Sequence, residues 1–184
     1  MPFFNGLLSL MNDRKPPPRC FAPLENAGCR ILILGSMPGV ESLRQQQYYA
    51  HPRNAFWPIM ASLFGIGSHL PYAERCAHLV ANRIALWDVM RTCQRSGSLD
   101  SAIERDSIQA NNFPAFFRSH RHLNAVFFNG AAAEQTFQRK VARQHADADW
   151  LPETRIRLPS TSPANARLAV DDKIHHWQII RQHL

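Results

Sequence analysis

The stretch ILILGSMPGVESLRQQQYYAHPRNAFW, residues 31–57, decides which fold we expect. Its first four residues are apolar, include two β-branched side chains and stop at Gly35. A run this short also fits part of a buried helix, but the glycine and proline residues behind it favour a buried β-strand. A long polar loop follows. Asn54 then stands where a helix can start, because apolar residues recur after it at helical spacing.

The rest of the chain alternates between strands and helices. We predict further strands over 84–89, 125–129 and 155–158, and helices over 54–64, 71–82, 113–121, 131–144 and 170–183. Residues 90–112 are expected to contain short pieces, with one or two helical turns over 99–106 and a turn over 107–112. Strands separated by helices imply a parallel sheet with helices on both faces. The predicted fold class is therefore α/β, a three-layer α/β/α sandwich with a central, mainly parallel four-stranded sheet.

Length and composition indicate one ordinary globular domain. The 184 residues suit a single domain over 1–184, in which the proline-rich residues 1–29 form an N-terminal arm. No apolar run is long enough to span a membrane. The N-terminus lacks the basic leader and cleavage site of a secretory signal. We therefore expect a cytoplasmic monomer.

Charge and cysteine spacing narrow the choice of ligand. The chain carries 21 Lys and Arg against 14 Asp and Glu, a net charge of +7, and arginine dominates. Guanidinium groups suit phosphate, so nucleic acid is a consistent partner, although charge alone does not identify one. The four cysteines contain no CxxC pair, which argues against an iron–sulfur cluster. We expect no metal and no cofactor.

Polar side chains gather where a ligand of an α/β sheet is expected. Such ligands bind beyond the carboxyl ends of the strands. The loop after the first strand brings Tyr48, Tyr49, His51, Arg53 and Asn54 within seven residues. A long loop inside a compact domain is more often functional than idle, although a purely structural role is the alternative.

Two segments resemble the motifs of a known family. GSMPG (35–39) followed by YYAHPRNAFW (48–57) resembles the first motif of the uracil-DNA glycosylase superfamily, and LPSTSPANAR (158–167) occupies the place of its second motif. The resemblance is closest to the branch that removes hypoxanthine, then to the mismatch-specific uracil glycosylases. It implies a monofunctional glycosylase acting on double- or single-stranded DNA that contains deaminated bases. The alternatives are a uracil or mismatch-specific glycosylase, a non-enzymatic binder of damaged DNA, and a small-molecule hydrolase.

The resemblance assigns the catalytic role to Asn54. In the mismatch-specific branch, the residue before the proline of the first motif is the asparagine that holds water, and this chain has Met37 there. Methionine cannot orient water, whereas the position of Asn54 matches an asparagine that takes the role in the hypoxanthine branch. An amide can accept from water and donate to it. The alternative is that Asn54 only caps the next helix.

The expected base contacts come from the first motif and from the second strand. The resemblance implies that Tyr49 stacks on the extruded base and that the backbone around Gly39 approaches it. Asp88, at the carboxyl end of its strand, can accept from N1–H of hypoxanthine, a donor that adenine lacks. Its alternative role is to cap a turn. The predicted base-binding residues are Ser36, Met37, Pro38, Gly39, Tyr49 and Asp88.

The second motif departs from the uracil-specific pattern. Leu158 stands where uracil glycosylases carry a histidine that stabilises the leaving pyrimidine. A purine can instead be helped to leave by protonation of its ring. The predicted DNA-binding residues are His51, Arg53, Ser160, Thr161, Ser162, Pro163 and Arg167, each with a structural role as its alternative.

Overall fold

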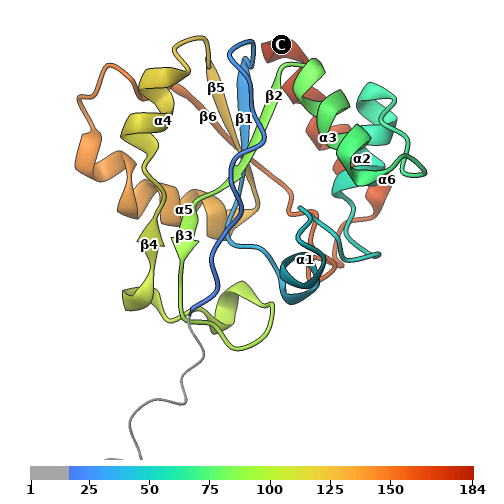
Figure 1. Cartoon of the computed structure of the whole chain (residues 1–184), viewed down its shortest axis with the longest axis horizontal. Helices are drawn as coiled ribbons and strands as arrows, with labels where there is room; N and C mark the ends of the chain where they lie inside the picture. The colour runs from blue at the N-terminus through green and yellow to red at the C-terminus, as the bar shows by residue number, and fades with distance from the viewer. Residues whose placement is uncertain (1–16) are drawn as a thin grey trace, which may run out of the picture.

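The centre of the fold is a four-stranded parallel sheet. The structure, a computed structural model, describes residues 17–184. The strands are β1 (Ile31–Gly35), β2 (Ile84–Asp88), β5 (Ala125–Asn129) and β6 (Thr154–Leu158), in the order β2-β1-β5-β6. All three pairings are parallel, and Gly35 is in register with Asp88. The predicted fold class is confirmed (Figure 1).

Helices cover both faces of the sheet. One face packs against α2 (Phe56–Phe64), α3 (Tyr72–Ala81) and α6 (Val170–Trp177), and the other against α4 (Phe113–Ser119) and α5 (Ala131–Lys140) (Figure 1). Ile31 and Ile33 point into the first layer, whereas Leu32 and Leu34 point into the second. Both faces of β1 are therefore buried, which explains its uninterrupted apolar sequence. Two helices end earlier than predicted and continue as 3₁₀ turns, over 142–145 and 178–183.

The described part of the N-terminal arm runs along the free edge of β2. Leu24 and Leu86 exchange two backbone hydrogen bonds of 2.9 Å each, and the indole of Trp87 donates to the carbonyl of Phe21. This pairing covers backbone groups that an edge strand would otherwise expose. Residues 1–16 of the predicted arm lie outside the described residues.

Two segments differ from the prediction. The loop expected after β1 contains a short helix, α1 (Val40–Gln45), which ends where Gln46 takes a left-handed conformation. Residues 90–112 contain a small antiparallel sheet of β3 (Met90–Thr92) and β4 (Gln109–Ala110), in addition to two 3₁₀ turns over 100–102 and 105–107. The two 3₁₀ turns agree with the helical turns expected over 99–106. Elements of two to six residues are too short to show a periodic apolar pattern, so α1, β3 and β4 could not be predicted from the sequence.

Candidate active site

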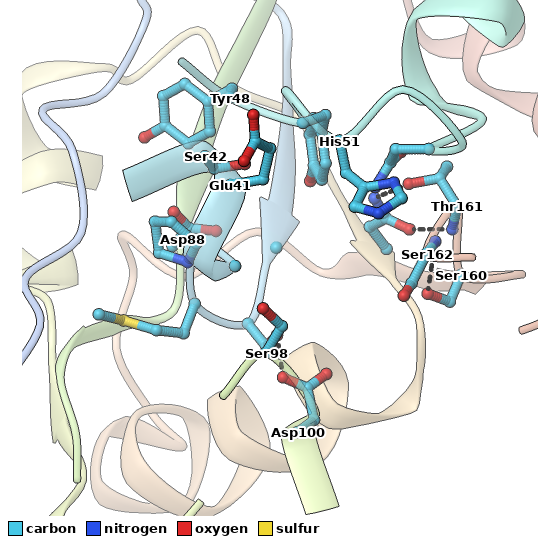
Figure 2. Close-up of a pocket in the computed structure, with 18 of the residues that line it drawn as sticks. Glu41, Ser42, Tyr48, His51, Asp88, Ser98, Asp100, Ser160, Thr161 and Ser162 are labelled. Atoms are coloured by element: carbon cyan, nitrogen blue, oxygen red, sulfur yellow. Dashed lines mark hydrogen bonds between the residues drawn. The ribbon is translucent and has the colours of Figure 1, made fainter. Parts of the chain in front are cut away.

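A cavity of about 140 Å³ opens at the carboxyl ends of the strands, where the site was expected. Every predicted site residue lines it except Arg53 and Arg167, which are exposed elsewhere on the surface. Figure 2 shows Asp88 and Ser160–Ser162 on opposite sides of this cavity, with Ser98 and Asp100 on a third side. The lining that was not predicted consists of Gly35, Glu41, Ser42, Tyr48, Ser98, Asp100 and Asn129.

Gly35 makes room for the two polar groups that lie beside it. A Cβ atom on this residue would overlap Oδ1 of Asp88 and lie 3.0 Å from the hydroxyl of Tyr49. Both oxygens therefore border the space that the missing side chain leaves open. Glycine is therefore needed at the end of β1, because any side chain there would fill part of the cavity.

Asp88 is an almost fully buried acid, with 3% of its surface exposed. Burial raises its pKa to about 7, the negative charge of Asp100 adds to the rise, and Arg95 opposes it. Its Oδ2 has no hydrogen-bond partner among the described residues. An unpaired buried oxygen is costly in a folded protein, so its place beside a cavity indicates a ligand contact.

Tyr49 is held in a strained conformation, with a φ of 55°. Its ring stacks on Phe56 with centroids 4.2 Å apart, so only the opposite face is available to a base. Its hydroxyl is buried without a partner of good geometry among the described residues. Burial, and then the charge of Asp88, raise the pKa of Tyr49, and nearby Asn129 opposes the rise. The hydroxyl is therefore protonated at neutral pH.

Asn54 is hydrogen-bonded to the first residue of a helix and also lines the cavity. Helix α2 begins at Phe56 and not at Asn54 as predicted, because Ala55 occupies the capping position. The side-chain oxygen of Asn54 nevertheless accepts a hydrogen bond of 3.0 Å from the amide of Phe56. A carbonyl oxygen has a second acceptor position, and the NH₂ group is a donor. The capping role and the water-holding role are therefore compatible.

The second motif is anchored by Asn129, which the sequence analysis missed. Its amide oxygen accepts from the backbone N–H of Thr161, and its NH₂ group donates to the Thr161 hydroxyl, both at 2.8 Å. The carbonyl of Thr161 in turn accepts from the amide of Ala55 at 3.0 Å. The position of Asn129 at the end of the predicted strand 125–129 was a signal that could have identified it.

Helix α6 supports the second motif from behind. The indole of Trp177 donates to the carbonyl of Pro159 at 3.0 Å, and the amine of Lys173 donates to the carbonyl of Asn165 at 2.9 Å. Burial lowers the pKa of Lys173. This amine is not among the groups that line the cavity.

Segment 95–100 holds the first motif in place through hydrogen bonds, and this contact was not predicted from the sequence. The hydroxyl of Ser36 donates to Asp100 at 2.8 Å, and the hydroxyl of Ser98 accepts from the amide of Val40 at 2.9 Å. Arg95 donates to the carbonyl of Pro38. These contacts fix the backbone that we expect to approach the base.

His51 lies at the rim of the cavity and is oriented by its own turn. Its Nδ1 accepts from the amide of Arg53 at 3.1 Å. A neutral ring with this bond carries its proton on Nε2, which is then free to donate. His51 thus has a structural role, because its ring holds the turn at Arg53. A phosphate contact through Nε2 is compatible with this role.

Within residues 17–184, no three His, Cys, Asp or Glu side chains are grouped so that they could hold a metal ion. Among the helices of these residues, none is long and apolar enough to cross a membrane.

Comparison with known proteins identifies the family of the chain. Residues 22–181 match the family profile described as the uracil DNA glycosylase superfamily. A Methanosarcina acetivorans protein named hypoxanthine DNA glycosylase is 33% identical over 166 residues, covering 90% of this chain and 98% of that protein. A protein of the same name from Methanosarcina barkeri is 39% identical over 111 residues, which cover 60% of this chain and 69% of that protein. The solution NMR structure of a candidate uracil DNA glycosylase from Methanosarcina acetivorans is similar in fold, with a TM-score of 0.69 and 31% sequence identity. The similarity covers 89% of this chain and 98% of that chain.

Proposed function

The chain belongs to the uracil DNA glycosylase superfamily and is a DNA glycosylase, and from this premise we propose that it removes hypoxanthine from DNA. Two relatives that carry the name hypoxanthine DNA glycosylase support this choice of base. The observation that carries it is Asp88, a buried carboxyl group at the cavity with an oxygen that has no hydrogen-bond partner within residues 17–184. As a carboxylate it accepts from N1–H of hypoxanthine. It repels the N1 lone pair of adenine, the parent base.

The target base reaches the cavity by rotating out of the helix, since its glycosidic bond is shielded inside the duplex. The cavity of about 140 Å³ is close to the size of about 150 Å³ at which another protein cavity accepts benzene. We expect one face of the base to lie on the free face of Tyr49. The backbone of residues 36–39 lines the same cavity and is held by segment 95–100.

Asn54 orients the water that attacks the sugar. The oxygen of the water bonds to C1′, and the bond between C1′ and N9 breaks with its electron pair going to N9. One proton of the water ends on the purine, and the hydroxyl group stays on the sugar. An amide orients the water through one accepted and one donated hydrogen bond, and it needs no shifted pKa to do so. No lysine among residues 17–184 lines the cavity, and this supports water rather than an amine as the nucleophile.

The phosphates of the extruded strand meet the rim of the cavity. Ser160, Ser162 and the Nε2 atom of His51 are donors on one side of it. The exposed Arg53 and Arg167 supply positive charge outside it. These contacts position the strand and carry no sequence information, as is usual for phosphate contacts.

Uracil is the second candidate, because a structural neighbour is described as a candidate uracil DNA glycosylase. Uracil also presents an N–H donor, at N3, so Asp88 does not exclude it. Met37 and Leu158 favour hypoxanthine. The first replaces the water-holding asparagine of the mismatch-specific uracil branch, and the second replaces the histidine that assists a pyrimidine leaving group.

The test uses matched labelled duplexes with hypoxanthine, uracil, xanthine or adenine at one position. Wild type and Asn54→Ala are incubated with each duplex, and alkali then cuts at abasic sites. We expect cleavage at hypoxanthine that falls at least 100-fold in Asn54→Ala. Cleavage mainly at uracil would contradict the choice of base. Binding without cleavage at any of the four bases would favour a non-enzymatic binder of damaged DNA.

A further inference from the structure

Thr161 is the point at which three parts of the site meet. Only 1% of its surface is exposed. Its backbone N–H and its hydroxyl are both bonded to the side chain of Asn129, and its carbonyl accepts from the amide of Ala55. Figure 2 shows Thr161 with Ser160 and Ser162, on the side of the cavity near His51. One residue of the second motif is thus bonded to the end of β5 and to the start of α2.

The side chain of Asn129 has only one orientation that satisfies both bonds. Its oxygen receives the N–H of Thr161, and its NH₂ group meets the Thr161 hydroxyl oxygen. If the amide were reversed, two donors would face each other at the backbone N–H. The pair therefore fixes the backbone and the side chain of Thr161 together, which a single hydrogen bond would not do.

The residue that follows β5, Gly130, allows this close contact. Gly130 has a φ of 94°, and a Cβ atom on it would lie 2.8 Å from the Cβ of Ser160. Its amide also donates to the carbonyl of Leu158 at 3.0 Å. The second motif therefore lies directly against the end of β5 and has little freedom to shift.

The chain of contacts leads from Asn129 to Asn54. Ala55, bonded to Thr161, follows Asn54 directly and occupies the capping position of α2. The side chain of Asn54 is bonded to the amide of Phe56 on the other side of Ala55. Asn54 is therefore held by its own bond to α2 and, through Ala55, by the second motif.

We propose that Asn129 is a positioning residue that holds Asn54 in its place for catalysis, acting through Thr161 and Ala55. This inference rests on the proposed function, because it takes Asn54 as the group that orients the attacking water. A misplacement of about 1 Å at a reacting group can reduce a rate about 100-fold. Loss of Asn129 is therefore expected to slow the bond-breaking step more than it weakens the binding of DNA.

A purely structural role makes a different prediction. If Asn129 only secured the second motif as a DNA contact, its loss would raise KM. The reduction in kcat/KM caused by loss of Asn129 would then be equally large whether or not Asn54 is present. Residues that act as one unit behave otherwise, because removing the second member costs little once the first is gone.

The experiment is a double-mutant cycle on hypoxanthine excision. It compares wild type, Asn129→Leu, Asn54→Ala and the double variant, with kcat and KM measured for each. Asn129→Asp is the conservative variant, because it keeps an oxygen that can accept from the N–H of Thr161. Asn165→Ala is the matched control: the Asn165 side chain also holds the second motif, through the carbonyl of Ser160 at 3.1 Å, but has no bond to Thr161.

We expect Asn129→Leu to lower kcat about 10- to 100-fold, with KM changed less than about threefold. Asn129→Asp should recover part of the loss, and Asn165→Ala should keep kcat within about twofold. In the Asn54→Ala background, Asn129→Leu should cause almost no further reduction. An effect on KM alone, or a full additional reduction in that background, would overturn the inference.

The test can still be interpreted if Asn129→Leu does not fold or if Asn54→Ala is unimpaired. If Asn129→Leu does not fold, Thr161→Val replaces it, because this near-isosteric change removes only the hydroxyl that Asn129 binds. The same cycle is then run, and additive reductions would overturn the inference. If Asn54→Ala excises hypoxanthine as fast as wild type, the proposed role of Asn54 fails first, and the inference fails with it. Additive effects with an impaired Asn54→Ala would refute the positioning role alone.

Discussion

Asp88→Asn should stabilise the protein at high pH while it impairs excision. The carboxyl group of Asp88 is 3% exposed, and its pKa is raised to about 7, chiefly by burial. The asparagine has nearly the same shape but cannot ionise, so it removes the cost of a buried charge without leaving a cavity. It also replaces the charged acceptor that we assign to N1–H of hypoxanthine with a neutral amide, whose oxygen accepts more weakly and whose NH₂ group only donates.

The magnitude follows from the difference between folded and unfolded pKa values. Below about pH 4 the carboxyl is protonated in both states. Between about pH 4 and 7 the unfolded chain releases the proton while the folded protein keeps it, so the free energy of unfolding falls as the pH rises. Above about pH 7 the loss is complete. A rise from 3.8 to about 7 corresponds to about 4 kcal/mol, a large part of the usual stability of a domain.

The assay is urea unfolding of both proteins between pH 4 and 8. The difference in unfolding free energy should be near zero at pH 4 and should reach about 4 kcal/mol in favour of Asp88→Asn at pH 8. Asp106→Asn, a change at an exposed aspartate, is the matched control and should leave the pH dependence unaltered. A difference that does not change with pH, or a variant less stable than wild type at pH 8, would refute the reasoning about a buried and uncompensated charge.

Three further substitutions test other parts of the site. Gly35→Ala should abolish excision, because the new methyl group overlaps Asp88 Oδ1; retention of wild-type kcat/KM would contradict this. Tyr49→Phe should raise the free energy of unfolding by about 1 kcal/mol in chemical denaturation, since it removes a buried hydroxyl that has no hydrogen-bond partner among the described residues. A loss of stability would show that the hydroxyl does form a hydrogen bond. Asn54→Ala should lower the free energy of unfolding by about 0.5–2 kcal/mol and Asn54→Asp by much less, because only aspartate keeps the bond to the amide of Phe56; equal losses would exclude a capping role.

Strands β1, β2 and β5 could be predicted because each is a clear run of apolar residues bounded by residues that favour turns. The strand 31–35 is apolar on both faces and is closed by Gly35, so its buried position in a parallel sheet could be inferred. The same rule that places ligands beyond the carboxyl ends of strands placed Asp88 beside the first motif, and both line the cavity. These predictions needed only local pattern and the connectivity of an α/β fold.

The parts that the sequence did not predict depend on contacts between distant residues. Asn129 binds Thr161, 32 positions away, and Ser36 binds Asp100, 64 positions away. No local pattern marks such a pair. The pKa of Asp88 likewise depends on burial by several segments and on the charges of Asp100 and Arg95. Pairings of this kind are set by the packing of the whole domain, which the composition of one segment cannot reveal.

The nature of the reaction products tests the central claim most directly. Wild-type protein is incubated with a duplex that contains one hypoxanthine, and the released base and the DNA strand are both identified by mass spectrometry, with and without borohydride. Hydrolysis by an Asn54-oriented water predicts free hypoxanthine, a strand that stays intact until alkali is added, and no protein trapped on the DNA. A strand cut without alkali, a borohydride-trapped protein–DNA adduct, or the absence of free base would contradict it.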